Sequence, residues 1–329
     1  MLKIGKVPES VLKRSIIKQI KTKRDEIIVG AGVGEDCAAI QLAEDEIFVT
    51  STDPITGTSH DIGALSVHVT ANDIASSGAE VIGVMLSVLL PEGTQEEELK
   101  KMMQQVEEVC SKLNIQTVGG HTEVTAVVNQ PVITTTGIGK VKKDKLVTTS
   151  GARCGDDVVV TKWIGLEGTS IIAKEKEDVL SKRFSSSFLE TAKRFSDYLS
   201  VVEDAKTAVS VGVTAMHDVT EGGIFGALWE VAESSGCGLN IDLHDIPVRQ
   251  ETVEICEEFG LNPYALISSG SMLITTKDGA GVVRSLKNAG INAAVIGKVT
   301  DGNDRVVCYG DEKRFLEPPK SDELYRIYE

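Results

Sequence analysis

The stretch HDVTEGGIFGAL, residues 217–228, puts five polar or glycine residues directly in front of an apolar helical pattern. They are His217, Asp218, Thr220, Glu221 and Gly222. The start of a helix needs one capping oxygen to satisfy its free N–H groups, so an imidazole, two acids and a hydroxyl exceed that need. This surplus indicates that the junction holds a ligand, and it raises the question of which other segments serve the same site.

The composition restricts the classes of function. The chain has 329 residues, and 34 basic residues against 49 acidic ones give a net charge of −15. This charge disfavours binding to nucleic acid or to anionic membranes, because proteins that bind them use cationic surfaces. A nucleotide ligand remains compatible with it, because Mg²⁺ can bridge carboxylates and phosphates. We therefore expect no nucleic-acid partner and no membrane association.

The sequence also indicates a cellular compartment. No apolar run reaches the roughly 18 residues of a membrane span, and the first residues, MLKIGKVPES, lack the apolar region of a signal peptide. The six cysteines stand far apart, without a Cys-x-x-Cys pair. That pattern is typical of reduced thiols rather than of a disulfide framework or a zinc site. We therefore expect a cytoplasmic protein.

Strand-like and helix-like runs alternate along the chain, which predicts a mixed α and β protein. The clearest helix is TQEEELKKMMQQVEEVCSKLN, residues 94–114, in which Thr94 and Glu97 are expected to form a capping box. The polar segment at 142–157 interrupts the apolar periodicity, so we place a domain boundary near residue 150, with domains at 1–150 and 151–329. Strands are expected at 46–51, 81–90, 131–141, 156–162, 271–276 and 293–299.

Four segments of the first half combine acidic residues with glycine or proline. They are GVGEDCAAI with Glu35 and Asp36, TSTDPITG with Asp53, ANDIASSGAE with Asn72 and Asp73, and VGGHTEVT with Gly119, Gly120, His121, Thr122 and Glu123. Each segment alone also fits an ordinary turn, because Asp caps its own backbone and Gly accepts a positive φ. We expect Asp53 at the end of a strand that Pro54 terminates, and VGGHTEVT between strands.

Asp73 favours a functional interpretation. It lies in an expected helix that begins near Ile62 and carries few charges. An acid in such a helix is either solvated on an outer face or held by a cation. Mg²⁺ prefers hard oxygen ligands, and ATP needs backbone N–H groups that approach closely, which glycine permits. The four segments meet both needs if the fold brings them together.

The usual nucleotide and hydrolase motifs are absent. The sequence has no G-x-x-x-x-G-K-[ST], the run GAGVGED lacks the third glycine of G-x-G-x-x-G, and no G-x-S-x-G occurs. His121 and His217 each lie in a cluster of Gly, Asp, Thr or Glu, and they are candidates for contact with phosphate or substrate.

Six segments, taken in order, resemble one known superfamily. They are GEDCAAI, TDPITG, ANDIASSGAE, GGHTEV, HDVTEGGIFGALWEVAE and LISSGSMLI, between residues 34 and 274. The superfamily contains aminoimidazole ribonucleotide synthetase, thiamine-monophosphate kinase, selenide water dikinase and the hydrogenase maturation protein HypE. GGHTEV and HDVTEGG make the chain most similar to the HypE-like members, because the thiamine-phosphate kinases typically carry an Asp where His121 stands.

The resemblance implies an α/β (α+β) fold of two domains. The N-terminal domain, with a mixed sheet, would bind ATP and form a homodimer, and a C-terminal α/β domain would pack against it. ATP and Mg²⁺ are the implied cofactors. The implied site residues are Asp36, Asp53, Asp73 and Glu123 for metal and phosphate, Asn72, Gly119, Gly120, His121 and Thr122 for the nucleotide, and His217, Asp218 and Glu221 for catalysis at the cleft, where Gly222 and Gly223 would let a helix start approach the ligand.

The final stretch, SDELYRIYE, departs from the HypE pattern. HypE-type proteins act on their own C-terminal cysteine in an ending like Pro-Arg-Ile-Cys, whereas Tyr328 follows Arg326 and Ile327 here. A phenol with a pKa near 10 does not replace a thiolate as a sulfur carrier, and the last cysteine, Cys308, is expected in a core strand. We therefore expect an ATP- and Mg²⁺-dependent enzyme that phosphorylates an amide or carbonyl oxygen of a separate small-molecule or protein-borne carboxamide.

Three alternatives stay open. The first is hydrogenase maturation by carbamoyl dehydration, with a partner's cysteine and other maturation proteins. The second is a thiamine-phosphate-type kinase, for which GGHTEV and HDVTEGG are the wrong variants. The third is a nucleotide-binding scaffold without turnover. The expected acids argue against it, because a protein that only binds a polyanion has less need of several carboxylates near it.

Overall fold

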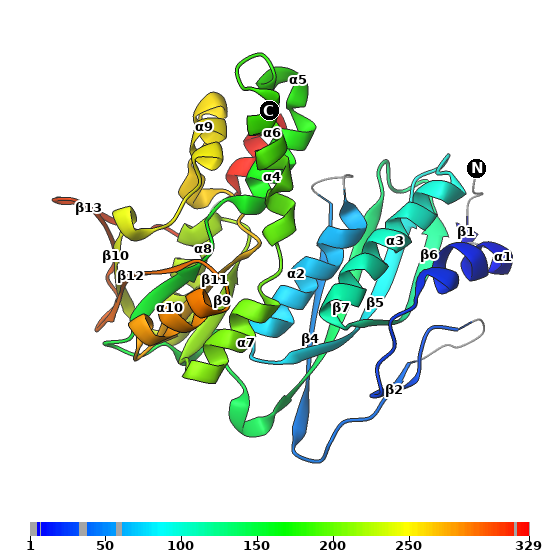
Figure 1. Ribbon diagram of the computed structural model, residues 1–329, viewed down its shortest axis with the longest axis horizontal. Helices are drawn as coiled ribbons and strands as arrows, with labels where there is room; N and C mark the ends of the chain where they lie inside the picture. Colours follow the sequence, from blue (N-terminus) through cyan, green and yellow to red (C-terminus); the bar gives the residue numbers. More distant parts are fainter. Residues whose placement is uncertain (1–4, 7, 33–37, 57–60, 319–320, 329) are drawn as a thin grey trace. The chain divides into compact units, whose positions relative to one another are not determined.

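The computed structural model describes residues 5–6, 8–32, 38–56, 61–318 and 321–328. The chain forms two compact units: unit 1 comprises residues 1–74 and 79–146, and unit 2 comprises residues 75–78 and 147–329. Each unit is built on one large β-sheet with helices packed against it (Figure 1). The mixed α and β fold expected from the alternating pattern is confirmed. None of the helices in the described ranges combines the length and apolar character that a membrane crossing requires.

The sheet of unit 1 is mixed. Its strand order is β1-β6-β5-β7-β4, where β5 and β6 run parallel and the other neighbours run antiparallel. The strands are β1 (Gly5–Lys6), β4 (Glu46–Ile55), β5 (Glu80–Leu90), β6 (Gln116–Val124) and β7 (Val132–Lys142). β5 lies inside the sheet and most of its residues are buried, which agrees with its nearly continuous apolar sequence.

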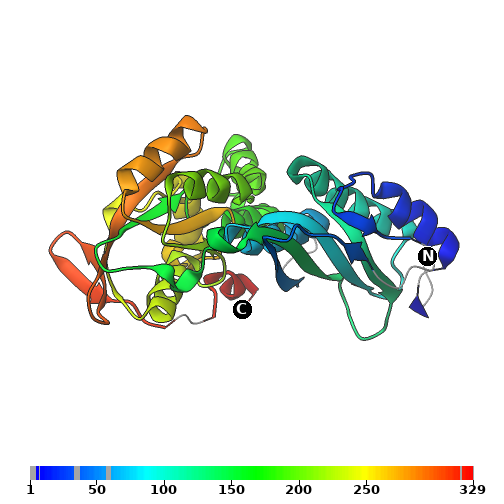
Figure 2. The same ribbon diagram turned by 90° about the horizontal axis from the view of Figure 1, so that it is seen from below.

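Two long helices, α2 (Ile62–Ser76) and α3 (Glu96–Leu113), belong to the helical layer of unit 1 (Figure 1). Glycines allow α2 to approach the sheet, because a Cβ on Gly137 would lie 2.6 Å from Thr70 Cγ2, and one on Gly139 would lie 2.4 Å from Ile74 Cγ2. A Cβ on Gly63 would likewise lie 2.4 Å from the Met102 carbonyl oxygen of α3. The two helices therefore pack together, and the close contacts of α2 fall on the sheet face of Gly137 and Gly139. The teal helix α3 lies on one side of its strands in the second view (Figure 2).

A small ribbon covers part of the opposite face of this sheet. It consists of β2 (Ile27–Val29) and β3 (Ala39–Ile40), which pair antiparallel. Its apolar side chains pack against a buried cluster that includes Ile138. Because side chains alternate along a strand, Ile138 points to the face opposite the one on which Gly137 and Gly139 approach α2. Unit 1 also contains α1 (Glu9–Val11), η1 (Leu12–Ile16), η2 (Ile17–Gln19) and η3 (Lys143–Lys145).

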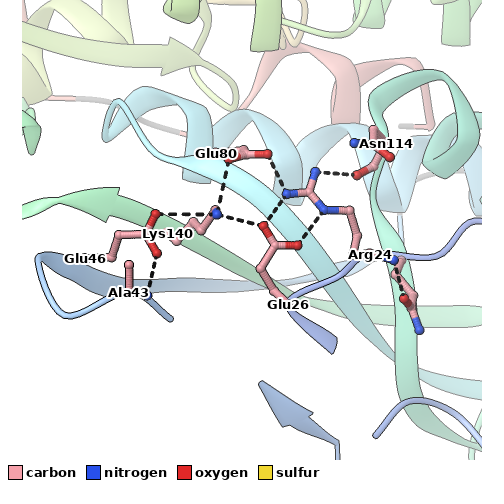
Figure 3. A network of polar contacts seen from close by, with 8 residues as sticks. Arg24, Glu26, Ala43, Glu46, Glu80, Asn114 and Lys140 are labelled. Atoms are coloured by element: carbon pink, nitrogen blue, oxygen red, sulfur yellow. Dashed lines mark hydrogen bonds and ion pairs between the residues drawn. The ribbon is translucent and has the colours of Figure 1, made fainter. Parts of the chain in front are cut away.

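An ionic network anchors the start of this ribbon to the sheet (Figure 3). Arg24 Nη2 lies 2.8 Å from Glu26 Oε1 and 2.5 Å from Glu80 Oε1. Lys140 Nζ lies 2.7 Å from Glu26 Oε1 and 3.4 Å from Glu46 Oε1. The hydrogen bond from Arg24, assisted by Lys140 and opposed by partial burial, lowers the pKa of Glu26 to about 2. Glu26 therefore stays charged in the folded protein at every ordinary pH.

Unit 2 contains a seven-stranded sheet of order β14-β13-β10-β12-β8-β11-β9, in which only β10 and β13 of the described strands pair parallel. The strands are β8 (Asp157–Thr161), β9 (Ala215–Val219), β10 (Gly238–Asp242), β11 (Ser271–Thr276), β12 (Ala293–Thr300), β13 (Arg305–Tyr309) and β14 (Glu312–Phe315). The five described cysteines that are free include Cys308 in β13.

Three buried clusters hold unit 2 together. One packs α8 (Gly223–Ser235) on a sheet face, and another packs α7 (Val202–Val211) and α10 (Gly279–Asn288) on the other. The third joins α4 (Leu166–Glu175), α6 (Ser186–Lys193), α9 (Gln250–Phe259) and η8 (Glu323–Tyr328). The remaining helical turns are α5 (Glu177–Leu180), η4 (Thr149–Gly151), η5 (Arg194–Tyr198), η6 (Leu243–Asp245) and η7 (Pro263–Ala265).

The structure corrects three local expectations. Residues 119–123 do not form a loop but lie inside β6, where they pair with β5 from Met85 to Leu89. Pro54 does not end the β4 ladder, since Pro54 and Ile55 still pair with β7; β4 is an edge strand, where a missing N–H is tolerated. The capping box of α3 uses Gln95 and Glu98, one residue later than expected.

Candidate functional site

A cavity of about 490 Å³ lies in unit 1 beside β6. Four of the five expected nucleotide-binding residues line it: Gly119, Gly120, His121 and Thr122. The fifth, Asn72, is fully buried on α2 and does not line this cavity. Most of the other walls come from β5, from β7 and from segments 12–20 and 30–32. The glycine run at 30–32 and the glycine pair of β6 therefore meet at one hollow, although 86 residues separate them in sequence.

The two glycines of β6 have different physical roles. Gly120 has φ = +147°, and a Cβ there would lie 2.1 Å from the Leu86 carbonyl oxygen. Glycine is thus required at 120 by the pairing with β5. At Gly119 a Cβ would meet only Met85 Cε, at an ordinary 3.6 Å. Of these two glycines, only Gly119 lacks a packing reason to be glycine. The close approach of a ligand to its backbone would explain why position 119 has no side chain.

Two of the expected metal ligands come together around one hydroxyl group. Ser51 Oγ lies 2.5 Å from Asp73 Oδ2 and 3.4 Å from Asp53 Oδ2. β4 supplies Ser51 and Asp53, which alternate onto the same face, and α2 supplies Asp73. All three donors are hard oxygens, and Mg²⁺ in nucleotide sites is commonly held by one or two carboxylates together with phosphates and waters. The pair therefore fits a metal that arrives with a polyphosphate.

A third expected metal ligand, Glu123, lies elsewhere. Cross-strand neighbours share a face of a sheet, and Asp53 lies opposite Thr135, which lies opposite Leu86. Glu123 lies opposite Leu89 on β5. Leu89 is an odd number of residues from Leu86, so the side chain of Glu123 points to the face of the sheet opposite that of Asp53. There it accompanies His121, whose Nε2 is 3.2 Å from Glu123 Oε2.

Asp36 lies outside the described residues. Within the described ranges, no group of three or more His, Cys, Asp or Glu side chains is arranged to hold a metal ion. A single unit 1 therefore presents a two-carboxylate site on the α2 face and a His–Glu pair on the other face.

The expected catalytic residues lie in unit 2. His217 and Asp218 are neighbours in β9 and alternate between its faces, and Glu221 follows the strand. His217 Nε2 is 2.7 Å from Glu230 Oε2 of α8. Burial alone would lower the pKa of His217, but the hydrogen bond to Glu230 and the charges of Asp218 and Glu230 outweigh it and raise the pKa. His217 is thus biased toward the imidazolium form, which donates from both nitrogens.

Asp218 and Glu221 have separate environments. Asp218 is buried, and its Oδ1 accepts a hydrogen bond from Ser76 Oγ at 3.4 Å. Glu221 Oε1 accepts one from Tyr325 Oη at 2.7 Å. Gly223 has a packing role of its own, because a Cβ there would lie 2.7 Å from the carbonyl oxygens of Tyr264 and Leu266. Gly223 therefore lets α8 begin against the protein's own backbone.

Sequence reasoning missed two buried acids near Glu221. Glu167 on α4 and Asp322 before η8 are 4% and 2% exposed. Burial raises the pKa of Glu167 to about 7, and the charges of Asp322 and Glu221 add to the rise, while Ser269 beside it opposes it. Glu167 has a local signal, since it stands in the apolar helical run that starts at Leu166. Asp322 has none, because its partners lie far away in sequence.

The chain is similar to known proteins along most of its length. The N-terminal domain model of AIR synthase related proteins matches residues 34–141, and the C-terminal domain model matches residues 153–309. A putative hydrogenase expression/formation protein of Methanocaldococcus jannaschii is 29% identical, over 98% of this chain and 97% of that protein. Carbamoyl dehydratase HypE of Cupriavidus necator is 32% identical, over 73% of this chain and 68% of that protein.

Solved structures agree at the level of the fold. The crystal structure of the hydrogenase maturation protein HypE in complex with ATP superposes with a TM-score of 0.81, covering 98% of this chain and 97% of that one at 21% identity. The fold is therefore shared over nearly the whole length of both chains.

Proposed function

Because the chain belongs to the AIR synthase related family as a HypE-like member, we propose that it is an ATP- and Mg²⁺-dependent enzyme that phosphorylates an amide or carbonyl oxygen. The observation that carries the proposal is the 32% identity to carbamoyl dehydratase HypE of Cupriavidus necator. The likeness in fold to a HypE structure that contains ATP supports the choice of nucleotide. The substrate is proposed to be a carboxamide on a separate small molecule or protein.

The geometry of unit 1 supports a nucleotide site. Asp53 and Asp73 would hold Mg²⁺, with Ser51 fixing the Asp73 carboxylate. Gly119 would give the polyphosphate access to a backbone N–H, and His121 and Thr122 line the same cavity. Bound Mg-ATP would supply an electrophilic γ-phosphoryl group, and positioning and charge neutralisation would be the main tasks of the protein. We propose that Asp36 and Asn72 complete the site and that the nucleotide-binding units form a homodimer. Because Glu123 points to the other face of its own sheet, it would reach the site from the second subunit.

The three other proposed site residues belong to unit 2. His217, with its raised pKa, is proposed to donate a hydrogen bond to negative charge that develops during transfer. Asp218 is proposed to orient His217, whose Nδ1 is 3.9 Å from Asp218 Oδ1. Glu221 is proposed to accept a proton from the substrate's amide nitrogen.

Calorimetry tests the nucleotide site directly. Wild-type protein should bind ATP with Mg²⁺ and more weakly without it. Asp73→Asn should lower the affinity for Mg-ATP by about tenfold or more, because one charged ligand of the metal is lost. Glu203→Gln, at an exposed pair with Lys206, is the matched control and should bind like wild type. Wild-type protein that binds no ATP with Mg²⁺ would refute the proposal.

Turnover separates an enzyme from a nucleotide-binding scaffold. With carboxamide probes, wild type should release phosphate or ADP and Asp53→Asn should not. If Asp53→Asn binds ATP more tightly while wild type shows no turnover, then a scaffold is the better description, because the substitution only relieves repulsion. Turnover of thiamine phosphate instead would identify a kinase of that type.

Hydrogenase maturation is a second candidate, favoured by the relative from Methanocaldococcus jannaschii, which matches almost end to end. In that case the chain would dehydrate a carbamoyl group carried on a cysteine of another maturation protein. Co-purification from cells that express hydrogenases should then recover such a partner with wild-type protein, in an amount that Asp53→Asn does not reduce.

A further inference from the structure

The segment 322–328 is docked on unit 2 by one buried carboxylate. Asp322 Oδ2 accepts a hydrogen bond from Gly222 N at 2.7 Å, and its Oδ1 accepts from Ile267 N at 3.1 Å and from Leu324 N at 2.8 Å. These N–H groups belong to the start of α8, to the loop before β11 and to the segment itself. Asp322 thus joins three parts of unit 2 that are distant in sequence.

Apolar and polar contacts complete the docking. Leu324 and Ile327 are 3% and 8% exposed, and they belong to the core shared with α4, α6 and α9. Tyr325 donates its hydroxyl hydrogen to Glu221 Oε1 at 2.7 Å. Glu323 Oε2 accepts from Asn262 N at 3.1 Å and pairs with Arg326 at 2.6 Å. While the segment is docked, Glu221 is engaged by Tyr325.

A third acid lies under this docked segment. Glu167 is buried, and its Oε2 has no hydrogen-bond partner among the described residues. Its titratable neighbours are Asp322, Glu221 and Tyr325, with Ser269 as the polar neighbour. In the part of the chain that is described, no lysine, arginine or histidine forms an ion pair with Glu167, Glu221 or Asp322. Among the described residues, the three acids therefore lie together without a cation in an ion pair.

We propose that residues 322–328 form a proton-controlled latch, which holds Glu221 while Glu167 is protonated and releases it when Glu167 loses its proton. A charged Glu167 would bury a third negative charge beside Asp322 and Glu221, and release of the segment admits water to all three. The docking is reversible in this view, because hydrogen bonds and two apolar side chains hold it, with no covalent link.

The direction of the pH effect follows from the two states of Glu167. Docking raises the pKa of its carboxyl group to about 7, whereas exposure to water would return the pKa toward its usual value near 4.3. The docked state therefore holds the extra proton, so docking is strongest below that usual value. It weakens as the pH rises toward 7 and changes little above 7.

The consequence for activity rests on the proposed function, because Glu221 is one of the proposed catalytic residues. The latch itself does not depend on it, and hydrogen exchange of nucleotide-free protein tests it separately. Exchange of the Gly222, Ile267 and Leu324 amides reports docking, once measured rates are corrected for the intrinsic effect of pH. An absence of ATP turnover would thus leave the exchange result intact.

In wild-type protein, corrected exchange at these three amides should rise from pH 5 to pH 7 by up to about tenfold per pH unit, because one proton is linked to release. Glu167→Gln should keep the amides protected with no such slope. Glu203→Gln should behave like wild type. Tyr325→Phe removes one contact, so it should raise exchange at every pH and leave the slope unchanged.

Two results would overturn the latch. One is a wild-type exchange rate at these amides that does not change with pH. The other is an equal pH slope in wild type and Glu167→Gln, for which circular dichroism would verify the fold. If Glu167→Gln does not fold, Glu167→Asp provides the second variant: its shorter side chain changes the carboxyl group's contact with the cluster, so an unshifted pH midpoint would contradict the latch.

Discussion

At the scale of single residues, the contrast between Gly119 and Gly120 distinguishes a structural glycine from a functional one. The two are neighbours in one strand, yet only Gly120 has a positive φ and a backbone carbonyl in the place of its missing Cβ. Sequence reasoning selected both glycines together, because a dipeptide of glycines shows no difference between them. The distinction depends on β5, which lies beside β6 only after folding.

The first prediction uses that pair. Gly120→Ala should lower the free energy of unfolding by about 1–3 kcal/mol from backbone strain alone, and by more if the overlap with Leu86 is not relieved. Gly119→Ala should change stability much less and weaken Mg-ATP binding instead. Urea unfolding and calorimetry on both variants measure the two effects. Equal destabilisation by the two substitutions would contradict the assignment.

The acids show where prediction from sequence ends at this scale. Asp53 and Asp73 were selected from their local settings, and the structure places both beside Ser51. Glu167 and Asp322 were not selected, because their burial and raised pKa values arise from contacts between distant segments. The roles assigned to His217, Asp218 and Glu221 remain predictions.

At the scale of elements, the long periodic segments could be read from the sequence, but the shorter polar strand could not. The apolar stripe from Leu99 to Val109 faces inward from α3 as expected. Apolar runs likewise marked β5 and β7. β6 was missed at residues 119–123, because its glycines and polar residues indicate a turn by local chemistry, whereas pairing with β5 on one side stabilises an extended chain.

The second prediction concerns the ribbon β2–β3 and its ionic anchor. Glu26→Gln should lower the free energy of unfolding at pH 7 by about 1–3 kcal/mol, because hydrogen bonds from Arg24 and Lys140 to a charged group are lost. The pKa of Glu26 is about 2 in the folded protein, against an ordinary value of 4.5. The difference between wild type and variant should therefore be full above about pH 4.5 and shrink as the pH falls toward 2.

Urea unfolding at several pH values between 3 and 7 measures this difference. Glu203→Gln again serves as the exposed control, and it should stay within about 0.5 kcal/mol of wild type. A difference that grows on acidification would show that Glu26 is not the charged centre of the network.

At the scale of the whole molecule, the net charge of −15 sets the conditions for binding a polyphosphate. Metal-free ATP meets a repulsive field, whereas Mg²⁺ removes part of the ligand's charge. The third prediction is therefore that added KCl strengthens the binding of metal-free ATP, and affects Mg-ATP less, because salt screens the repulsion between like charges.

Calorimetry between about 50 and 300 mM KCl measures this trend, a range over which the Debye length shortens markedly. Binding of metal-free ATP that weakens with salt would indicate a locally cationic site, and the Asp53–Asp73 pair would then not face the phosphates. The fold class and the family could be predicted from the sequence at this scale, because the motifs extend over nearly its full length. The register that places Glu123 on the other face from Asp53 could not.

The position of Asp322 also bears on how the protein is made. The ribosome adds residues 322–328 after every other segment that they contact. Until they leave the exit tunnel, the nascent chain lacks the acceptor for Gly222 N and Ile267 N and the two apolar side chains, Leu324 and Ile327, that fill the core beside α4. Unit 2 would therefore complete its folding only after residues 322–328 have left the exit tunnel, and a chain that stalls or terminates before them would expose that gap to chaperones and proteases.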